Sequence, residues 1–235
     1  MGGRSLVKNF NGTDDHQPQV SVIVAAYNQE KYIGRCMRSL LKQSLPQKSY
    51  EIIVVDDGSI DKTNFALNLF SDGFGSPVRV ITNAKNLGLP AALNIGILAA
   101  RAPLIVRVDS DDFVNENFLN FLFQYMLQNP DCSAVACDYL LTDDSENIIK
   151  RQNCDEDPIA CGIMFKSSAL HKIGLYNEEF RFLEEKELRV RFEKKFKVER
   201  LAIPLYRYRR HANNHTNNVQ QMQQFAKKLR NKVNS

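Results

Sequence analysis

Short apolar runs rich in β-branched residues recur along the chain and predict buried strands. They cover residues 20–26, 52–55, 78–81, 104–108 and 133–137. Between them, apolar residues repeat with the helical period over 32–41 and over 118–126, and Pro90 stands where a helix would begin and run to residue 100. This alternation of strand and helix predicts an α/β fold, with a mostly parallel sheet covered by helices on both faces.

Polar residues set the expected boundaries of these elements. Asn28 follows the first strand and is expected to cap the next helix, and Asp61 is expected to cap a helix that reaches Phe70. After Asp138 the alternation weakens. There we expect a strand over 162–165, a helix over 184–196 and a last strand over 198–203.

Length and composition are those of a soluble globular protein with one main domain. The 235 residues suffice for a sizeable core, and 43% hydrophobic against 25% charged residues is an ordinary balance. No apolar run reaches the roughly 18–20 residues that a membrane span needs. Residues 1–19 are polar and lack the apolar core of a signal peptide, so we expect a flexible leader and a cytoplasmic protein.

The net charge of +4 hides an asymmetry along the chain. Residues 186–235 hold 14 Lys or Arg against 3 Asp or Glu, whereas the first 185 residues hold 17 basic and 24 acidic ones. The acidic part could hold a metal. The basic part could meet phosphates or an anionic surface, which leaves peripheral contact with a membrane open. For residues 217–235 we expect a solvated, partly disordered basic tail.

The cysteines predict packing rather than chemistry. There are five of them, an odd number, and no CxxC pair is present, so we expect reduced thiols packed as small apolar groups. The same spacing disfavours a zinc site. The cysteines are Cys36, Cys132, Cys137, Cys154 and Cys161.

Candidate chemistry gathers where the predicted strands end. Three strands end in polar or acidic residues, at 26–28, 56–59 and 109–112. Carboxyl ends of parallel strands lie at one edge of a sheet, where ligands bind, so five carboxylates would crowd together there. Their repulsion favours a hard divalent cation, Mg²⁺ or Mn²⁺, with oxygen ligands. Capping of the following helices explains Asp61 but not three carboxylates at 109–112.

The sequence lacks the motifs of two common nucleotide sites. The turn after the first strand reads AAYNQE and has no glycine, so the dinucleotide fingerprint is missing, and the chain has no Walker phosphate loop. A nucleotide would therefore be held by metal and side chains. The YRYRRH stretch, basic with interleaved aromatics, suits phosphate contact, but no nucleic-acid recognition motif is present and we expect no nucleic-acid partner.

An ordered set of motifs resembles the family 2 glycosyltransferases, inverting enzymes with the GT-A fold. The set comprises SVIVAAYNQEKYI, EIIVVDDGSIDKT, NLGLPAALNIGILAA, DSDD, CGIMFKSSALHKIGLYNEEF, LEEKELRVRF and YRRHANNHT, and it spans residues 20 to about 216. The resemblance implies a Rossmann-like glycosyltransferase domain over 20–216. It also implies a nucleotide-diphosphate sugar donor, by default UDP-linked, and a glycan, lipid-linked or protein acceptor, as in polysaccharide biosynthesis.

The resemblance also implies roles for residues on the donor side. Asp57 is similar to a carboxylate that contacts the nucleobase, and Tyr27 to a residue that stacks on it. Asp109 resembles a ribose or sugar contact that also belongs to the metal pair, Asp111 a metal ligand, and Asp112 a residue that shares the metal. Lys85 and Asn86 stand where the family contacts donor phosphate or sugar. A segment that closes over the diphosphate is implied for Arg209, Arg210 and His211.

The catalytic base is implied by the LEEKEL segment. The family carries a Glu-Asp pair before a helix with a Leu and an Arg, and here Glu184-Glu185 is followed by Leu188 and Arg191. Glu185 takes the usual Asp position and is the expected base, with Glu184 as the second candidate. The alternative is a solvated helix start, where acids suit the helix dipole.

Two other functions stay open at this point. A sugar nucleotidyltransferase would share the sheet and the metal but attack phosphorus, and it usually has a Gly-rich loop that AAYNQE lacks. A nucleotide-sugar-binding module without transfer activity is favoured by the longer side chain of Glu185 and opposed by the intact DSDD and DDGS segments.

Overall fold

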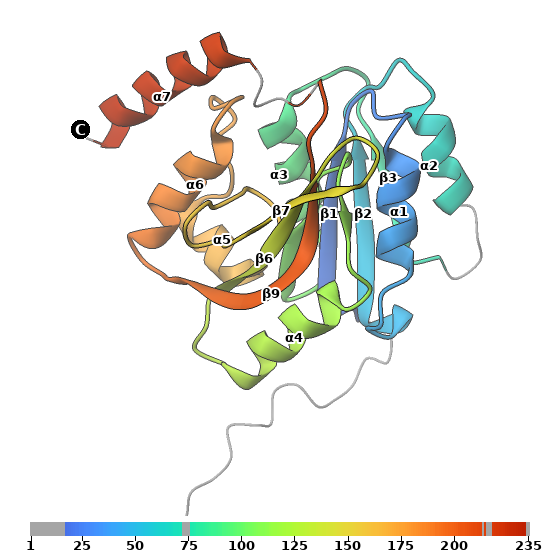
Figure 1. Ribbon diagram of the computed structural model, residues 1–235, viewed down its shortest axis with the longest axis horizontal. Helices are drawn as coiled ribbons and strands as arrows, with labels where there is room; N and C mark the ends of the chain where they lie inside the picture. Colours follow the sequence, from blue (N-terminus) through green and yellow to red (C-terminus); the bar gives the residue numbers. More distant parts are fainter. Residues whose placement is uncertain (1–16, 72–75, 213, 215–217, 234–235) are drawn as a thin grey trace, which may run out of the picture.

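The computed structural model describes residues 17–71, 76–212, 214 and 218–233 (Figure 1). Most of the predicted leader lies outside these residues. The described strands form one sheet in the order β3-β2-β1-β4-β8-β6-β9-β5, and β7 pairs with β6. Their bounds are β1 Val20–Ala26, β2 Tyr50–Asp56, β3 Val78–Thr82, β4 Leu104–Arg107, β5 Phe113–Val114, β6 Ala134–Thr142, β7 Ile148–Gln152, β8 Ile163–Lys166 and β9 Val198–Arg209.

The helices lie on both faces of this sheet, as predicted. They are α1 Ile33–Leu41, α2 Thr63–Ser71, α3 Leu89–Ala99, α4 Phe118–Gln128, α5 Ser167–Ile173, α6 Glu184–Glu193 and α7 Val219–Val233, with a 3-10 turn at Gln47–Ser49. Alternate residues of β1 divide between two cores. Val22 packs with α1, α2 and α4 on one face, whereas Ile23 packs with α3, α5 and α6 on the other. This period of two is what an α/β sheet requires of a central strand.

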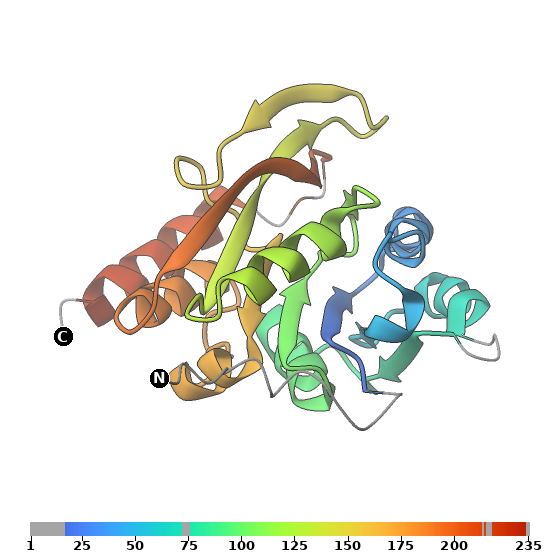
Figure 2. The same cartoon turned by 90° about the horizontal axis from the view of Figure 1, so that it is seen from below.

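Parallel pairing joins β3, β2, β1 and β4, the half of the sheet that the sequence predicted best. β8 runs antiparallel between β4 and β6, so the sheet is mixed beyond that point. β9 pairs in parallel with β6 and continues to Arg209, six residues past the predicted end of that strand at 203. This extension pairs Tyr206 and Arg207 with β5, directly after the DSDD segment, and β9 lies beside β6 along its length (Figure 2).

The capping prediction for Asn28 is wrong. Its backbone is left-handed, with φ of 53°, and α1 begins later, after Tyr32. The amide and side chain of Asn28 instead hydrogen-bond Ser59 Oγ and the Ile60 N–H, so they join the loop after β1 to the loop after β2. Asp61 accepts a hydrogen bond from the Thr63 N–H at the start of α2, as predicted.

The expectation of a partly disordered tail is wrong for the described part of 217–235, which forms α7. Phe225 packs on Phe180 at 6.0 Å between ring centroids, and Lys228 donates to the Glu179 carboxylate. Lys232 donates to Glu187 Oε1 in α6 at 2.7 Å. A largely polar sequence is therefore held as a helix by its contacts with the segment around α6 (Figure 1).

The prediction for the cysteines is confirmed. All five are buried and free, which agrees with reduced thiols used for packing. Among the described residues, no helix combines the length and the apolar character needed to cross a membrane.

Candidate functional site

The carboxyl ends of β1, β2 and β4 lie side by side. Ala26 is in register with Asp56, and Ile23 with Arg107. Past the strand ends, the Asp57 N–H donates to Ala26 O and the Val108 N–H to Ile23 O. The polar segments at 26–28, 56–59 and 109–112 therefore meet at one edge of the sheet, as predicted.

On the β2 side of this edge, Asp57 holds the loop that precedes α3. Its buried carboxylate accepts hydrogen bonds from the Asn83 side chain at 2.7 Å and from the Leu87 and Gly88 amides. Both oxygens of Asp57 are thus engaged by protein groups, and the contact with a nucleobase stays a prediction.

Gly58 allows the same two loops to approach each other. It has φ of +75°, and a Cβ atom built on it would lie 2.6 Å from the carbonyl carbon of Lys85. Lys85 and Asn86 are exposed on this rim, and Tyr27, just past the end of β1, is 42% exposed. Of the expected donor-binding residues on this side, Tyr27, Lys85 and Asn86 therefore stand at the solvent edge, whereas Asp57 is buried behind them.

The DSDD segment after β4 is held from three sides. The Asp109 carboxylate accepts a hydrogen bond from the Arg107 guanidinium, with Nε 2.6 Å from Oδ1. Asp111 contacts His211 Nε2 at 2.9 Å. Asp112 is buried and accepts hydrogen bonds from the Tyr206 hydroxyl at 2.8 Å and the Arg209 N–H at 2.7 Å. Burial, followed by the charges of the two neighbouring carboxylates, raises the pKa of Asp112 well above its usual value.

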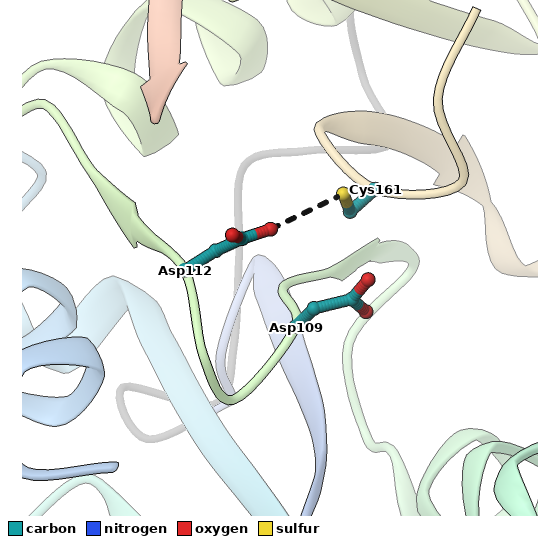
Figure 3. A group of neighbouring side chains, drawn as sticks. All are labelled: Asp109, Asp112 and Cys161. Atoms are coloured by element: carbon teal, nitrogen blue, oxygen red, sulfur yellow. Dashed lines mark hydrogen bonds between the residues drawn. The ribbon is translucent and has the colours of Figure 1, made fainter. Parts of the chain in front are cut away.

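The side chains of Asp109, Asp112 and Cys161 place ligand atoms within 4.8 Å of one another (Figure 3). Burial and the neighbouring carboxylates raise the pKa of the Cys161 thiol well above its usual value, so it stays protonated and points at Asp112. A soft thiol is a poor ligand for Mg²⁺ or Mn²⁺. The partly exposed Asp109 and Asp111 carboxylates could hold such a cation, and Arg107 donates to both oxygens of Asp109. Asp112 stands behind them, buried, with both of its oxygens bonded too.

Arg209 anchors the segment rather than projecting into the site. Its side chain is 3% exposed and donates to Asp111 O, Asp144 O and Glu146 Oε1. Arg210 is exposed, and its backbone N–H donates to Thr142 O. Three residues were expected to close over a diphosphate. Of these, Arg209 is buried, Arg210 is exposed, and His211 contacts the Asp111 carboxylate.

The start of α6 approaches the same edge from the other side. Glu184 is buried and accepts a hydrogen bond from Arg107 Nη1 at 3.0 Å. The next residue, Glu185, has no side-chain partner for its carboxylate among the described residues. Burial and the neighbouring Glu184 charge raise the pKa of Glu185 to about 7. A carboxylate with this pKa can exchange protons near neutral pH.

Two residues of the site were missed by sequence reasoning. Arg107 joins Asp109 to Glu184, and Tyr206 donates to Asp112 while its hydroxyl accepts the Asp109 N–H. A signal for Arg107 was present, because an arginine inside an apolar strand needs a buried partner. Tyr206 gave no comparable signal, since tyrosine is common in strands.

Comparisons with known proteins agree with this geometry. The model of the family described as Glycosyl transferase family 2 matches residues 21–194. Glycosyltransferase GlyG of Streptococcus pneumoniae is 37% identical over 127 residues, which cover 54% of this chain and 41% of GlyG.

Two solved structures share the fold. Staphylococcus aureus TarS in complex with UDP-GlcNAc superposes with a TM-score of 0.74 at 20% identity, covering 86% of this chain and 61% of that one. A mannosyltransferase from Pyrobaculum calidifontis, in complex with GDP-Man and Mn²⁺, gives a TM-score of 0.67 at 18% identity, covering 85% of this chain and 58% of that one. The likeness confirms the predicted fold. In each of these three comparisons the chain spans less than two thirds of the protein it matches.

Proposed function

The chain belongs to glycosyl transferase family 2, and from that premise we propose that it transfers a sugar from a nucleotide-diphosphate donor to an acceptor hydroxyl, with inversion at the anomeric carbon. The observation that carries the proposal is the pairing of two features at one sheet edge. The acidic DSDD segment lies there, and Glu185, with a pKa of about 7, follows the residue tied to that segment through Arg107.

The donor is proposed to be UDP-linked. TarS was solved with UDP-GlcNAc, and that likeness makes uracil the first base to test. The base would lie against Tyr27 and the Asp57 loop, where exposed Lys85 and Asn86 offer polar groups to phosphate or sugar. Because Asp57 already binds the amides of that loop, its main contribution would be to keep the loop in the binding conformation.

A divalent cation, Mn²⁺ or Mg²⁺, is proposed to be held by Asp109 and Asp111, with Asp112 behind them. The mannosyltransferase solved with Mn²⁺ supports this ion class. When bound, the cation supplies positive charge for the departing nucleoside diphosphate. The three acids are held in place by protein groups, because Arg107 contacts Asp109, His211 contacts Asp111 and Tyr206 contacts Asp112.

Glu185 is proposed to take the proton of the acceptor hydroxyl as its oxygen attacks the anomeric carbon. The new carbon–oxygen bond forms on the face opposite the leaving group, so the anomeric configuration inverts and the nucleoside diphosphate departs with the bonding electrons. His211 contacts Asp111 on the DSDD side of the site, and it would face the diphosphate together with the preceding Arg210. Glu184 stays paired with Arg107 and would not move a proton.

The glycosyltransferase domain would comprise residues 20–216, between the leader 1–19 and the basic C-terminal segment 217–235. The acceptor would be a glycan, a lipid-linked sugar or a protein. Peripheral contact with an anionic membrane would use exposed Lys227 and Arg230 of α7.

A panel of UDP-, GDP- and dTDP-linked sugars tests the proposal. Each is incubated with the protein and Mn²⁺ or Mg²⁺, and the nucleoside diphosphate released is measured with and without excess chelator. We expect release from a UDP-sugar that the chelator abolishes. Binding of nucleotide sugars without any turnover would favour the binding module instead.

A further inference from the structure

Arg107 occupies an unusual place in the fold. It lies on β4 between β1 and β8, and its side chain is only 6% exposed. Placing a guanidinium there costs desolvation energy unless opposite charges compensate it. The compensation comes from two carboxylates, Asp109 and Glu184.

These two carboxylates belong to different parts of the proposed mechanism. Asp109 is the first acid of DSDD, on the donor side. Glu184 is the first residue of α6 and stands directly before the proposed base, Glu185. Nε and Nη2 of Arg107 face Asp109 at 2.6 and 3.3 Å, while Nη1 faces Glu184 at 3.0 Å. The planar guanidinium of Arg107 thus contacts both carboxylates.

Among the described residues, no side chain caps the start of α6. The residue before it, Leu183, is left-handed with φ of 58° and provides no side-chain cap. Capping side chains and dipole partners normally define where a helix begins. Here the bond from Arg107 to Glu184 ties the first helical residue to a central strand.

We propose that Arg107 is a positioning residue that sets the distance between the donor carboxylate Asp109 and the base Glu185 by holding Asp109 and the α6 start in one rigid unit. This inference rests on the proposed function for the roles of Asp109 and Glu185. Arginine is required, because the ammonium of lysine is a single point and cannot bridge two carboxylates with fixed geometry. Loss of the bridge leaves Glu184 buried beside Glu185 without its cation, and the α6 start shifts.

The experiment compares Arg107→Gln, Arg107→Lys and the double variant Arg107→Gln with Glu184→Gln. The matched control is Arg200→Gln. Arg200 on β9 also forms an ion pair with a buried acid, Asp138 on β6, and this variant breaks that pair. For each protein kcat, donor KM, nucleoside diphosphate affinity and melting temperature are measured, together with hydrogen exchange of the amides at 184–188.

Arg107→Gln should lower kcat by about 100-fold, the cost of misplacing a catalytic group by about 1 Å. The affinity for nucleoside diphosphate should change by less than about threefold, because Asp109 keeps its charge. Arg107→Lys should not restore kcat. The double variant should recover at least about tenfold, because Glu184→Gln removes the unpaired charge and lets the two introduced side-chain amides hydrogen-bond each other. Arg200→Gln should lose stability and keep its kcat.

Wild-type kcat in Arg107→Gln would overturn the proposal. So would equal kcat losses in Arg107→Gln and Arg200→Gln, or lost nucleotide affinity with unchanged kcat. Should the wild type turn over no nucleotide sugar, the proposed function fails by itself. The positioning is still judged by exchange at 184–188, which must be faster in Arg107→Gln than in wild type and Arg200→Gln.

Discussion

Replacing Glu185 by glutamine should abolish most of the transfer while leaving the protein intact. Glutamine keeps the size of the side chain and removes the charge that accepts the acceptor proton. A general base contributes about 10²–10⁴-fold, which corresponds to about 2.7–5.5 kcal/mol of activation free energy. Glu184→Gln is the matched control. Its side-chain oxygen can still accept the hydrogen bond from Arg107, so its rate should fall far less.

The pH dependence follows from the pKa of about 7 for Glu185. The ionised form is the active one, so kcat should rise with pH up to about 7 and level off above it. At pH 5 about 1% of the carboxylate would be ionised, which places the rate about 100-fold below its plateau. The residual rate of Glu185→Gln should lack this dependence.

Stability should move in the opposite direction to activity. The folded pKa of about 7 lies above the ordinary value of 4.5, so the folded protein holds the Glu185 proton through this window. Stability from this group is full below pH 4.5 and is lost as pH rises to 7. At pH 8 the glutamine variant should therefore melt at or above the wild-type temperature. A variant with wild-type turnover, or one inactive only because it melts earlier at pH 8, would refute the reasoning.

Three further predictions concern the donor side. Asp57→Ala should raise donor KM more than it lowers kcat, because the freed Leu87 and Gly88 amides no longer hold the loop; steady-state kinetics with a large kcat loss at unchanged KM would contradict this. Gly58→Ala should weaken donor binding in calorimetry at least about tenfold, since a Cβ atom would lie 2.6 Å from the Lys85 backbone; unchanged affinity would contradict it. Asp111→Ala should abolish turnover and weaken Mn²⁺ binding measured by electron paramagnetic resonance; full wild-type turnover in excess chelator would show that no metal is needed.

The parts of the fold that local sequence determines were predicted well. The strand at 20–26 was predicted to the residue, because a buried central strand needs an unbroken β-branched apolar run. Asn28 failed as a cap because hydrogen bonds to the distant segment 59–60 hold it in a left-handed conformation. β5, of two residues, and the exposed β7 carry no periodicity that could have predicted them.

From the sequence, the site could be predicted only for residues that directly follow the predicted strands. Position in a parallel sheet was enough to bring Asp57 and Asp109 to one edge. The link from Arg107 to Glu184 spans 77 residues of sequence, and no local pattern encodes which buried acid meets which arginine. α7 was missed for a related reason, because its polar sequence becomes helical through contact with Phe180 and Glu187.

The central claim, inverting sugar transfer with a nucleoside diphosphate as leaving group, is tested most directly by time-resolved proton NMR. An α-linked nucleotide sugar that the protein turns over is incubated with the metal, and water serves as the acceptor. The account predicts that the β-anomer of the free sugar and the nucleoside diphosphate appear first, before mutarotation. Initial release of the α-anomer would contradict inversion, and release of sugar 1-phosphate with nucleoside monophosphate would show attack at phosphorus.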